Sequence, residues 1–152
     1  MTLTAHSLIA AAIISKVGNP ALGLPLVFVS HFVMDKVPHW DVMTDKKKTR
    51  KQIMVGTVTD IFTGFIAAFI FTAYARPEIN PAYFFSAVFV SQLPDLLEAP
   101  YLIPRFSNPI SKLSYEFQHW VHDLWFDART PAPWGVIIQL AITGAFLLWA
   151  VL

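Results

Sequence analysis

Cysteine is absent from this sequence of 152 residues, which excludes disulfide bonds, thiolate metal ligands and cysteine nucleophiles. Charge is also scarce, because only 14% of the residues are charged and the formal net charge is +1. Such a balance creates no strong field that would attract nucleic acid. Apolar residues make up 55% of the chain, more than a soluble domain usually carries. We therefore expect an integral membrane protein that binds no nucleic acid and whose spans are helical, since isolated strands leave backbone groups unpaired in lipid.

The apolar segments predict an all-α, polytopic membrane helical bundle of about five to six helices in a single domain over residues 1–152. The first segment is expected to be a retained helix, because no basic region precedes it as in a signal peptide. A basic cluster at 45–51 indicates that this end of the bundle faces the cytoplasm. Apolar periodicity and proline breaks predict helices at about 3–17, 20–37, 52–74 and 81–101, an interfacial helix at about 110–125 and a C-terminal anchor helix at about 134–152.

An internal repeat relates two parts of the chain. Residues 19–30 align without gaps on residues 80–91, and seven of the twelve positions are identical, including an Asn-Pro-Ala start. Asparagine before proline is typical of a helix N-terminus. We expect two related helical hairpins, at about 3–41 and 52–101, with a site at their interface, as in many membrane proteins built from repeats.

Polar residues capable of acid–base or metal chemistry interrupt the apolar segments. His31 and Asp35 are four residues apart and therefore share one face of a helix. If the basic loop lies in the cytoplasm, the helix ends that carry the other polar residues of this kind also lie on the cytoplasmic side of the membrane. Ionisable groups inside a membrane are costly and indicate a functional site. The candidates are His6, His31, Asp35, Asp60, Asp95, His119 and His122.

Imidazole and carboxylate groups without thiolates are typical ligands of zinc, with iron or manganese as alternatives. Seven candidates are too many for one tetrahedral site, so we expect two or three ions sharing a bridging carboxylate, an arrangement that activates water for hydrolysis. Asp35 and Asp60 are the candidate catalytic carboxylates, with Asp60 as a bridging ligand or general base. We expect the remaining nearby polar residues to lie at the membrane interface rather than to bind metal: His39, Asp41, Glu98 and Asp123.

Four motifs together resemble the bacterial inner-membrane metal-dependent hydrolases, a family related to the zinc-dependent phospholipases C. They are the N-terminal His6, a Ser-His-x-x-x-Asp at 30–35, a Leu-Pro-Asp at 93–95 and the pair His119 and His122. The order of these motifs and the spacing of the histidine pair differ from the usual family pattern. The resemblance implies a bacterial inner-membrane location, phosphoester hydrolysis, and zinc ligation by His6, His31, Asp35, Asp95, His119 and His122.

The leading hypothesis is therefore a membrane-embedded metal-dependent hydrolase acting on a phosphoester of a lipid or membrane-associated substrate. Two alternatives remain open. A transporter or carrier for a metal ion or small solute would explain the intramembrane charges and the repeat equally well. A membrane scaffold in which a metal holds the helices together would need the same ligands but no substrate.

Overall fold

The computed structural model describes residues 1–41, 47–102, 106, 108–124 and 128–152. Within these ranges the chain forms six helices and no strand, which confirms the all-α class. The helix bounds agree within two residues with those expected from the sequence; positions 45, 46 and 125 of the expected segments lie outside the described residues. The helices are α1 Leu3–Lys16, α2 Pro20–Asp35, α3 Arg50–Ala75, α4 Pro81–Leu102, α5 Pro109–Asp123 and α6 Trp134–Val151.

The two copies of the repeated sequence make the same local hydrogen bonds. Asn19 and Asn80 each accept a hydrogen bond from the backbone N–H two residues later, at 2.9 and 2.8 Å, and so begin α2 and α4. Ser30 and Ser91 each donate a hydroxyl hydrogen bond, 2.8 Å long, to the backbone carbonyl three residues earlier. Each copy therefore presents the residue that follows its serine, His31 or Gln92, at an equivalent place near the end of its helix.

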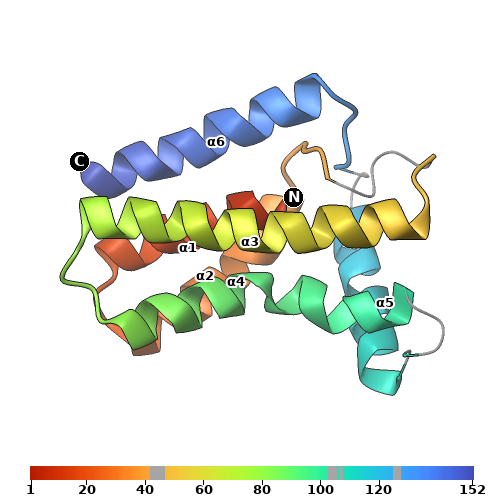
Figure 1. Ribbon diagram of the computed structural model, residues 1–152, viewed down its shortest axis with the longest axis horizontal. Helices are drawn as coiled ribbons and strands as arrows, with labels where there is room; N and C mark the ends of the chain where they lie inside the picture. Colours follow the sequence, from red (N-terminus) through yellow and green to blue (C-terminus); the bar gives the residue numbers. More distant parts are fainter. Residues whose placement is uncertain (42–46, 103–105, 107, 125–127) are drawn as a thin grey trace.

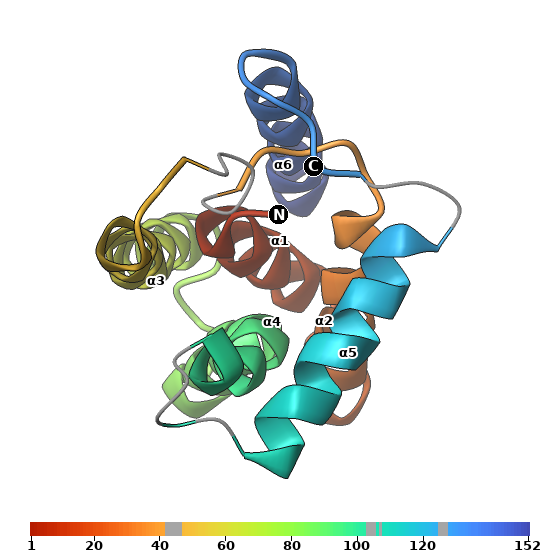
Figure 2. The same ribbon diagram turned by 90° about the vertical axis from the view of Figure 1, so that its right-hand side faces the viewer.

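Helix α1 forms the centre of the bundle, with α2, α3, α4 and α6 around it (Figure 2). Eleven of its 14 residues are buried. Small side chains allow this close packing, because a Cβ atom added to Gly64 of α3 would lie only 2.9 Å from Ser7 Oγ on α1. The polar residues of α1 are therefore held inside the protein.

Helices α3 and α6 are long and apolar enough to cross a membrane by length and composition. Only 11% of the most apolar window of α3 and 22% of that of α6 are buried within the molecule. Phe62, Ile66 and Ile70 of α3 are each more than half exposed, as is Leu140 of α6. The bundle thus presents large apolar side chains outward on two helices.

One end of the bundle collects the polar helix termini. Helix α1 begins there, α2 and α4 end there, and α5 crosses the same end at a steep angle to the other helices (Figure 1). Helix α5 packs mainly on α4 and also on α2. This arrangement brings the histidines and aspartates of four helices to one place.

Candidate metal centre

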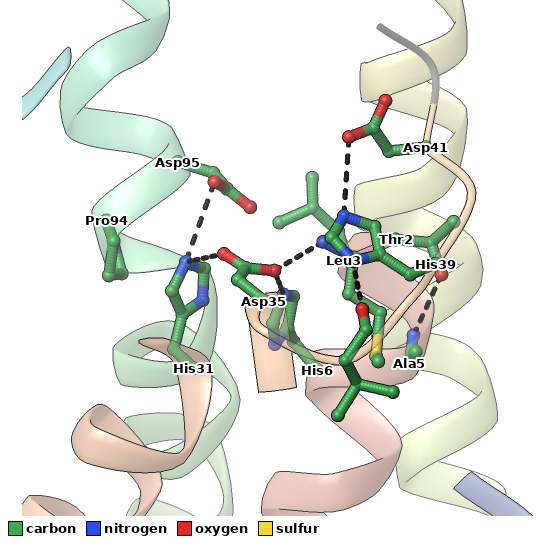
Figure 3. Close-up of polar contacts among 12 residues, drawn as sticks. Thr2, Leu3, Ala5, His6, His31, Asp35, His39, Asp41, Pro94 and Asp95 are labelled. Carbon is green, nitrogen blue, oxygen red and sulfur yellow. Dashed lines mark hydrogen bonds and ion pairs between the residues drawn. The ribbon is translucent and has the colours of Figure 1, made fainter. Parts of the chain in front are cut away.

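Asp35, the last residue of α2, lies at the centre of the polar cluster and is 2% exposed. Its Oδ1 lies 3.1 Å from His6 Nε2, and its Oδ2 lies 3.3 Å from His31 Nε2 and 3.6 Å from His122 Nε2. The amino group of Met1 also contacts Oδ1. Figure 3 shows Asp35 between the α1 and α4 sides of this cluster. A buried carboxylate is stable only with such donors or with a cation close by.

The hydrogen bond of His31 determines which of its ring nitrogens can bind a cation. His31 Nδ1 lies 2.8 Å from the backbone oxygen of Ser91. Because a carbonyl oxygen only accepts hydrogen bonds, Nδ1 carries the proton and Nε2 of the neutral ring carries the lone pair. That lone pair faces Asp35 and also Asp95 Oδ1, which lies 3.6 Å away (Figure 3). A carbonyl that orients a ligating histidine in this way is a common feature of metal sites.

His6 Nε2 and the Met1 amino group lie within hydrogen-bond distance of Asp35 Oδ1, whereas the two contacts of His31 Nε2 fit a shared cation better than direct hydrogen bonds. The contacts of His31 Nε2 at 3.3 and 3.6 Å exceed the usual 2.7–3.2 Å of an N–H···O hydrogen bond. Two ligand atoms each about 2.0–2.1 Å from a tetrahedral zinc ion lie about 3.3 Å apart. One ligand atom each from His6, His31 and Asp95 lie within 4.8 Å of one another. The described residues thus bring together a donor set that zinc accepts.

Gln118 links α5 to this cluster and was not identified from the sequence. Its Nε2 donates a 2.8 Å hydrogen bond to the carbonyl of Pro94, and its Oε1 lies 3.5 Å from His31 Nε2. Gln118 is 3% exposed. The sequence shows only that α5 contains a glutamine. That this glutamine is buried beside His31 depends on which face of α5 packs inward, and the structure alone shows that.

His122 is the residue of α5 that reaches Asp35. Burial lowers the pKa of the His122 imidazole to about 4, against the opposing effect of the Asp35 charge. The ring is therefore neutral at pH 7, the form in which histidine binds metals. The structure thus joins five of the seven expected residues through contacts of their side chains: His6, His31, Asp35, Asp95 and His122.

The other two expected residues, Asp60 and His119, make different contacts. Asp60 accepts hydrogen bonds from the backbone N–H groups of Leu3 and Thr4, at 2.7 and 3.1 Å, and from the Thr4 hydroxyl at 2.6 Å. It therefore caps the N-terminus of α1, whose first N–H groups have no partner within the helix. His119 packs its ring on Tyr115, with centroids 4.4 Å apart. Among the described residues neither makes an ion pair or hydrogen bond with the Asp35 cluster.

The side chain of His39 is buried within the protein, at 0% exposure, and its position at the membrane interface stays a prediction. Its backbone N–H donates to Ala128 and its carbonyl accepts from Thr130, at 3.0 and 2.6 Å, so the segment after α2 is paired with the segment before α6. Asp123 is exposed. Burial of His39 depends on contacts between residues about 90 positions apart, which no local pattern indicates.

A cavity of about 120 Å³ lies against the cluster. Asp60 of α3 and His119 of α5 also line it. Its lining contains five carboxylates, one arginine and the N-terminal Met1. Besides Asp60 and His119, the ionisable lining residues are Met1, Asp35, Asp41, Asp95, Glu98, Tyr115, His122 and Arg129.

Comparison with known proteins adds no relative: no family model matches the chain, and no curated protein or solved structure matches it. The resemblance of the four motifs to the inner-membrane hydrolases therefore stays an expectation from those residues alone.

Proposed function

We propose that this protein is a membrane-embedded metal-dependent hydrolase that acts on a phosphoester of a lipid or membrane-associated substrate. The observation that carries the proposal is the placement of His31 Nε2 close to both the buried Asp35 and the partly buried Asp95. A nitrogen lone pair 3.3 and 3.6 Å from two carboxylate oxygens is stable when a cation lies between them.

The residues that would hold the cation are His6, His31 and Asp95, with Asp35 between the two histidines. Three protein ligands leave an open position, which is typical of catalytic rather than structural zinc sites. When bound there, a divalent ion would supply Lewis acidity and lower the pKa of a coordinated water. Zinc is the ion this donor set favours, with iron or manganese as alternatives.

A membrane location is supported by the outward apolar faces of α3 and α6. Helix α3 has 26 residues and is about 39 Å long at ~1.5 Å per residue, enough for the ~30 Å hydrocarbon core. Asp60, which caps α1, lies ten residues after Arg50, about 15 Å along α3. The Asp35 cluster would thus lie deeper in the membrane than the first residues of α3. Basic residues just before α3 and in its first turn would put that end on the cytoplasmic side of a bacterial inner membrane.

The size and the lining of the cavity favour binding of the polar end of a substrate. Its volume of about 120 Å³ is small beside the roughly 300–1,000 Å³ of pockets that hold a whole drug-sized ligand. Arg129 on the wall supplies a guanidinium, which binds phosphate oxygens well. A phosphate ester fits both features, and the rest of a lipid would lie outside.

The two alternatives predict other properties. A carrier needs a polar route to the opposite end, whereas the middle of α1 consists of fully buried apolar residues, Ile9 to Ala12. A structural metal is favoured by one observation, namely that the candidate ligands come from three helices, α1, α2 and α4. Such an ion would hold the bundle together, and its removal would unfold the protein without any associated hydrolysis.

Metal content and hydrolysis measured on the same samples test the proposal. The purified chain, loaded with zinc in detergent, should hydrolyse a chromogenic phosphodiester and phospholipid in mixed micelles. His31→Ala and Asp95→Asn should lose zinc and more than about 100-fold in kcat, since even indirect partners of metal ligands cost 10–100-fold. The matched control is Glu116→Gln, an exposed carboxylate on α5 paired with Lys112. Zinc-loaded protein that cleaves no phosphoester would refute the proposal.

A further inference from the structure

We propose that a cavity at the end of the bundle opposite to the Asp35 cluster binds a phosphate group through Lys16 and Arg76. The turn between α1 and α2 and the turn between α3 and α4 both lie at this end, away from α5 (Figure 1). Residues of both turns line a cavity of about 920 Å³, here called the Lys16 cavity. This volume lies within the roughly 300–1,000 Å³ of pockets that hold small molecules. The proposal uses none of the candidate metal ligands and does not depend on the function proposed above.

Two cationic side chains line the Lys16 cavity, and they come from different helix ends. Lys16 lies in the last turn of α1, and Arg76 directly follows α3. Lys16 is half-buried, and among the described residues it makes no ion pair or hydrogen bond. An ammonium group without a counter-ion at the wall of a cavity attracts an anion to that cavity.

The guanidinium of Arg76 can accept a phosphate beside its present partner or in place of it. Glu78 is the only carboxylate among the described residues that line the Lys16 cavity. Arg76 NH1 lies 3.7 Å from Glu78 Oε1, and the two side chains are 41% and 67% exposed. Such an exposed ion pair contributes little stability, so replacing it costs little. A guanidinium carries five N–H donors and commonly binds two phosphate oxygens at once.

Tyr83 of α4 fixes one wall of the Lys16 cavity. Its hydroxyl donates a 2.7 Å hydrogen bond to the carbonyl of Val17, the residue after Lys16. Gly23 of α2 makes room for this contact, because a Cβ atom there would lie 1.7 Å from the Tyr83 hydroxyl oxygen. The turn that carries Lys16 is therefore tied to the helix that follows Arg76. A ligand bound by both cations would meet positions that are already fixed, which lowers the cost of binding.

The phosphate could belong to a lipid headgroup or be free in solution, and the surroundings of the cavity favour a lipid. Leu24 and Ile79 give the cavity an apolar part. The helices α2 and α4 also expose large apolar side chains, among them Leu22 at 61% and Phe85 at 53%. In the membrane arrangement proposed above, Arg76 lies at the end of α3 and thus at a membrane surface. Basic pockets at such a surface bind anionic lipid headgroups.

Titration with short-chain lipids and with free phosphate tests the site. The full chain, in neutral detergent with a chelator that keeps zinc from the metal centre, is titrated in a calorimeter, and empty micelles serve as the blank. The ligands are dihexanoyl phosphatidylglycerol, dihexanoyl phosphatidylcholine and sodium phosphate. Phosphatidylglycerol should bind most tightly, because the ammonium group of phosphatidylcholine offsets its phosphate charge. Lys16→Gln and Arg76→Gln should each weaken binding at least about tenfold, the effect of losing a hydrogen bond between charged groups.

Lys112→Gln is the matched control, because Lys112 is an exposed lysine on α5, at the other end of the bundle. It should keep the affinity of the unchanged protein. Gel filtration shows which variants fold, and either cavity variant suffices if the other does not. Sodium phosphate that binds as tightly as phosphatidylglycerol, with the same sensitivity to the variants, would support the site and assign it a soluble ligand. Equal affinities of the unchanged protein and the folded cavity variants, or of the two lipids, would overturn the site.

Discussion

Replacing Asp60 by alanine separates a capping role from metal binding. In the structure the Asp60 carboxylate accepts three hydrogen bonds, from the N–H groups of Leu3 and Thr4 and from the Thr4 hydroxyl. We therefore expect Asp60→Ala to destabilise the fold while the zinc content at saturation stays that of the unchanged protein. His31→Ala should show the opposite pattern, with zinc lost.

The expected size of the Asp60 effect follows from the hydrogen bonds it makes. Loss of an N-terminal cap costs about 0.5–2 kcal/mol, and a hydrogen bond to a charged group contributes about 1.5–3 kcal/mol. The three bonds are only partly buried, so water replaces some of them. We expect a loss of about 2 kcal/mol, which corresponds to a Tm about 4–8 °C lower for a chain of this length.

Thermal unfolding in detergent, followed by circular dichroism, measures this shift beside the zinc content of the same samples. Thr59→Ala is the matched control, since Thr59 is the exposed neighbour of Asp60 on α3, and its Tm should move by less than about 2 °C. Loss of zinc from Asp60→Ala with an unchanged Tm would show that Asp60 is a ligand and that the capping argument is wrong.

Three further predictions concern the cluster and its cavity. Gln118→Ala should weaken zinc affinity about 10–100-fold in calorimetry, because Gln118 holds α5 to Pro94 beside His31; equal affinity would contradict that positioning role. Free zinc at about 100 times its Kd should stabilise the folded protein by about 2.7 kcal/mol, so a chelator should lower the Tm of the unchanged protein but not that of His31→Ala; equal chelator sensitivity of both would exclude the Asp35 cluster as the site. Arg129→Gln should raise the KM for a phosphodiester about tenfold with a smaller change in kcat, since Arg129 lines the cavity and is the residue proposed to bind the phosphate; steady-state kinetics with an unchanged KM would remove Arg129 from substrate binding.

Local hydrogen bonding explains why the helices were predictable. Asn19 and Asn80 cap their helices through bonds that span two residues, and the prolines that follow suit the first turn. The pairing of His31 with Asp35 was predictable for the same reason, because an i,i+4 spacing on one helix places the side chains together at 3.3 Å. These features depend on neighbours in the sequence and on little else.

Asp60 and His39 show where the sequence alone was insufficient. Asp60 was identified as an ionisable residue in an apolar helix, but whether it meets a metal or a helix N-terminus depends on where α1 packs along α3. The sequence did not indicate that His39 is buried within the protein, where its backbone pairs with residues 128 and 130. Both outcomes depend on contacts between segments that are at least 56 residues apart.

The sequence by itself determined the helical class, the helix bounds and the chemistry of the donor set, because apolar periodicity, capping residues and the absence of cysteine act locally or through composition alone. Only the tertiary structure decided which donors face one another. The packing of the helices around α1 decides which side chains of different helices lie next to one another. A shift of one helix by a single turn, about 5.4 Å, is larger than the distance between two ligands that share an ion.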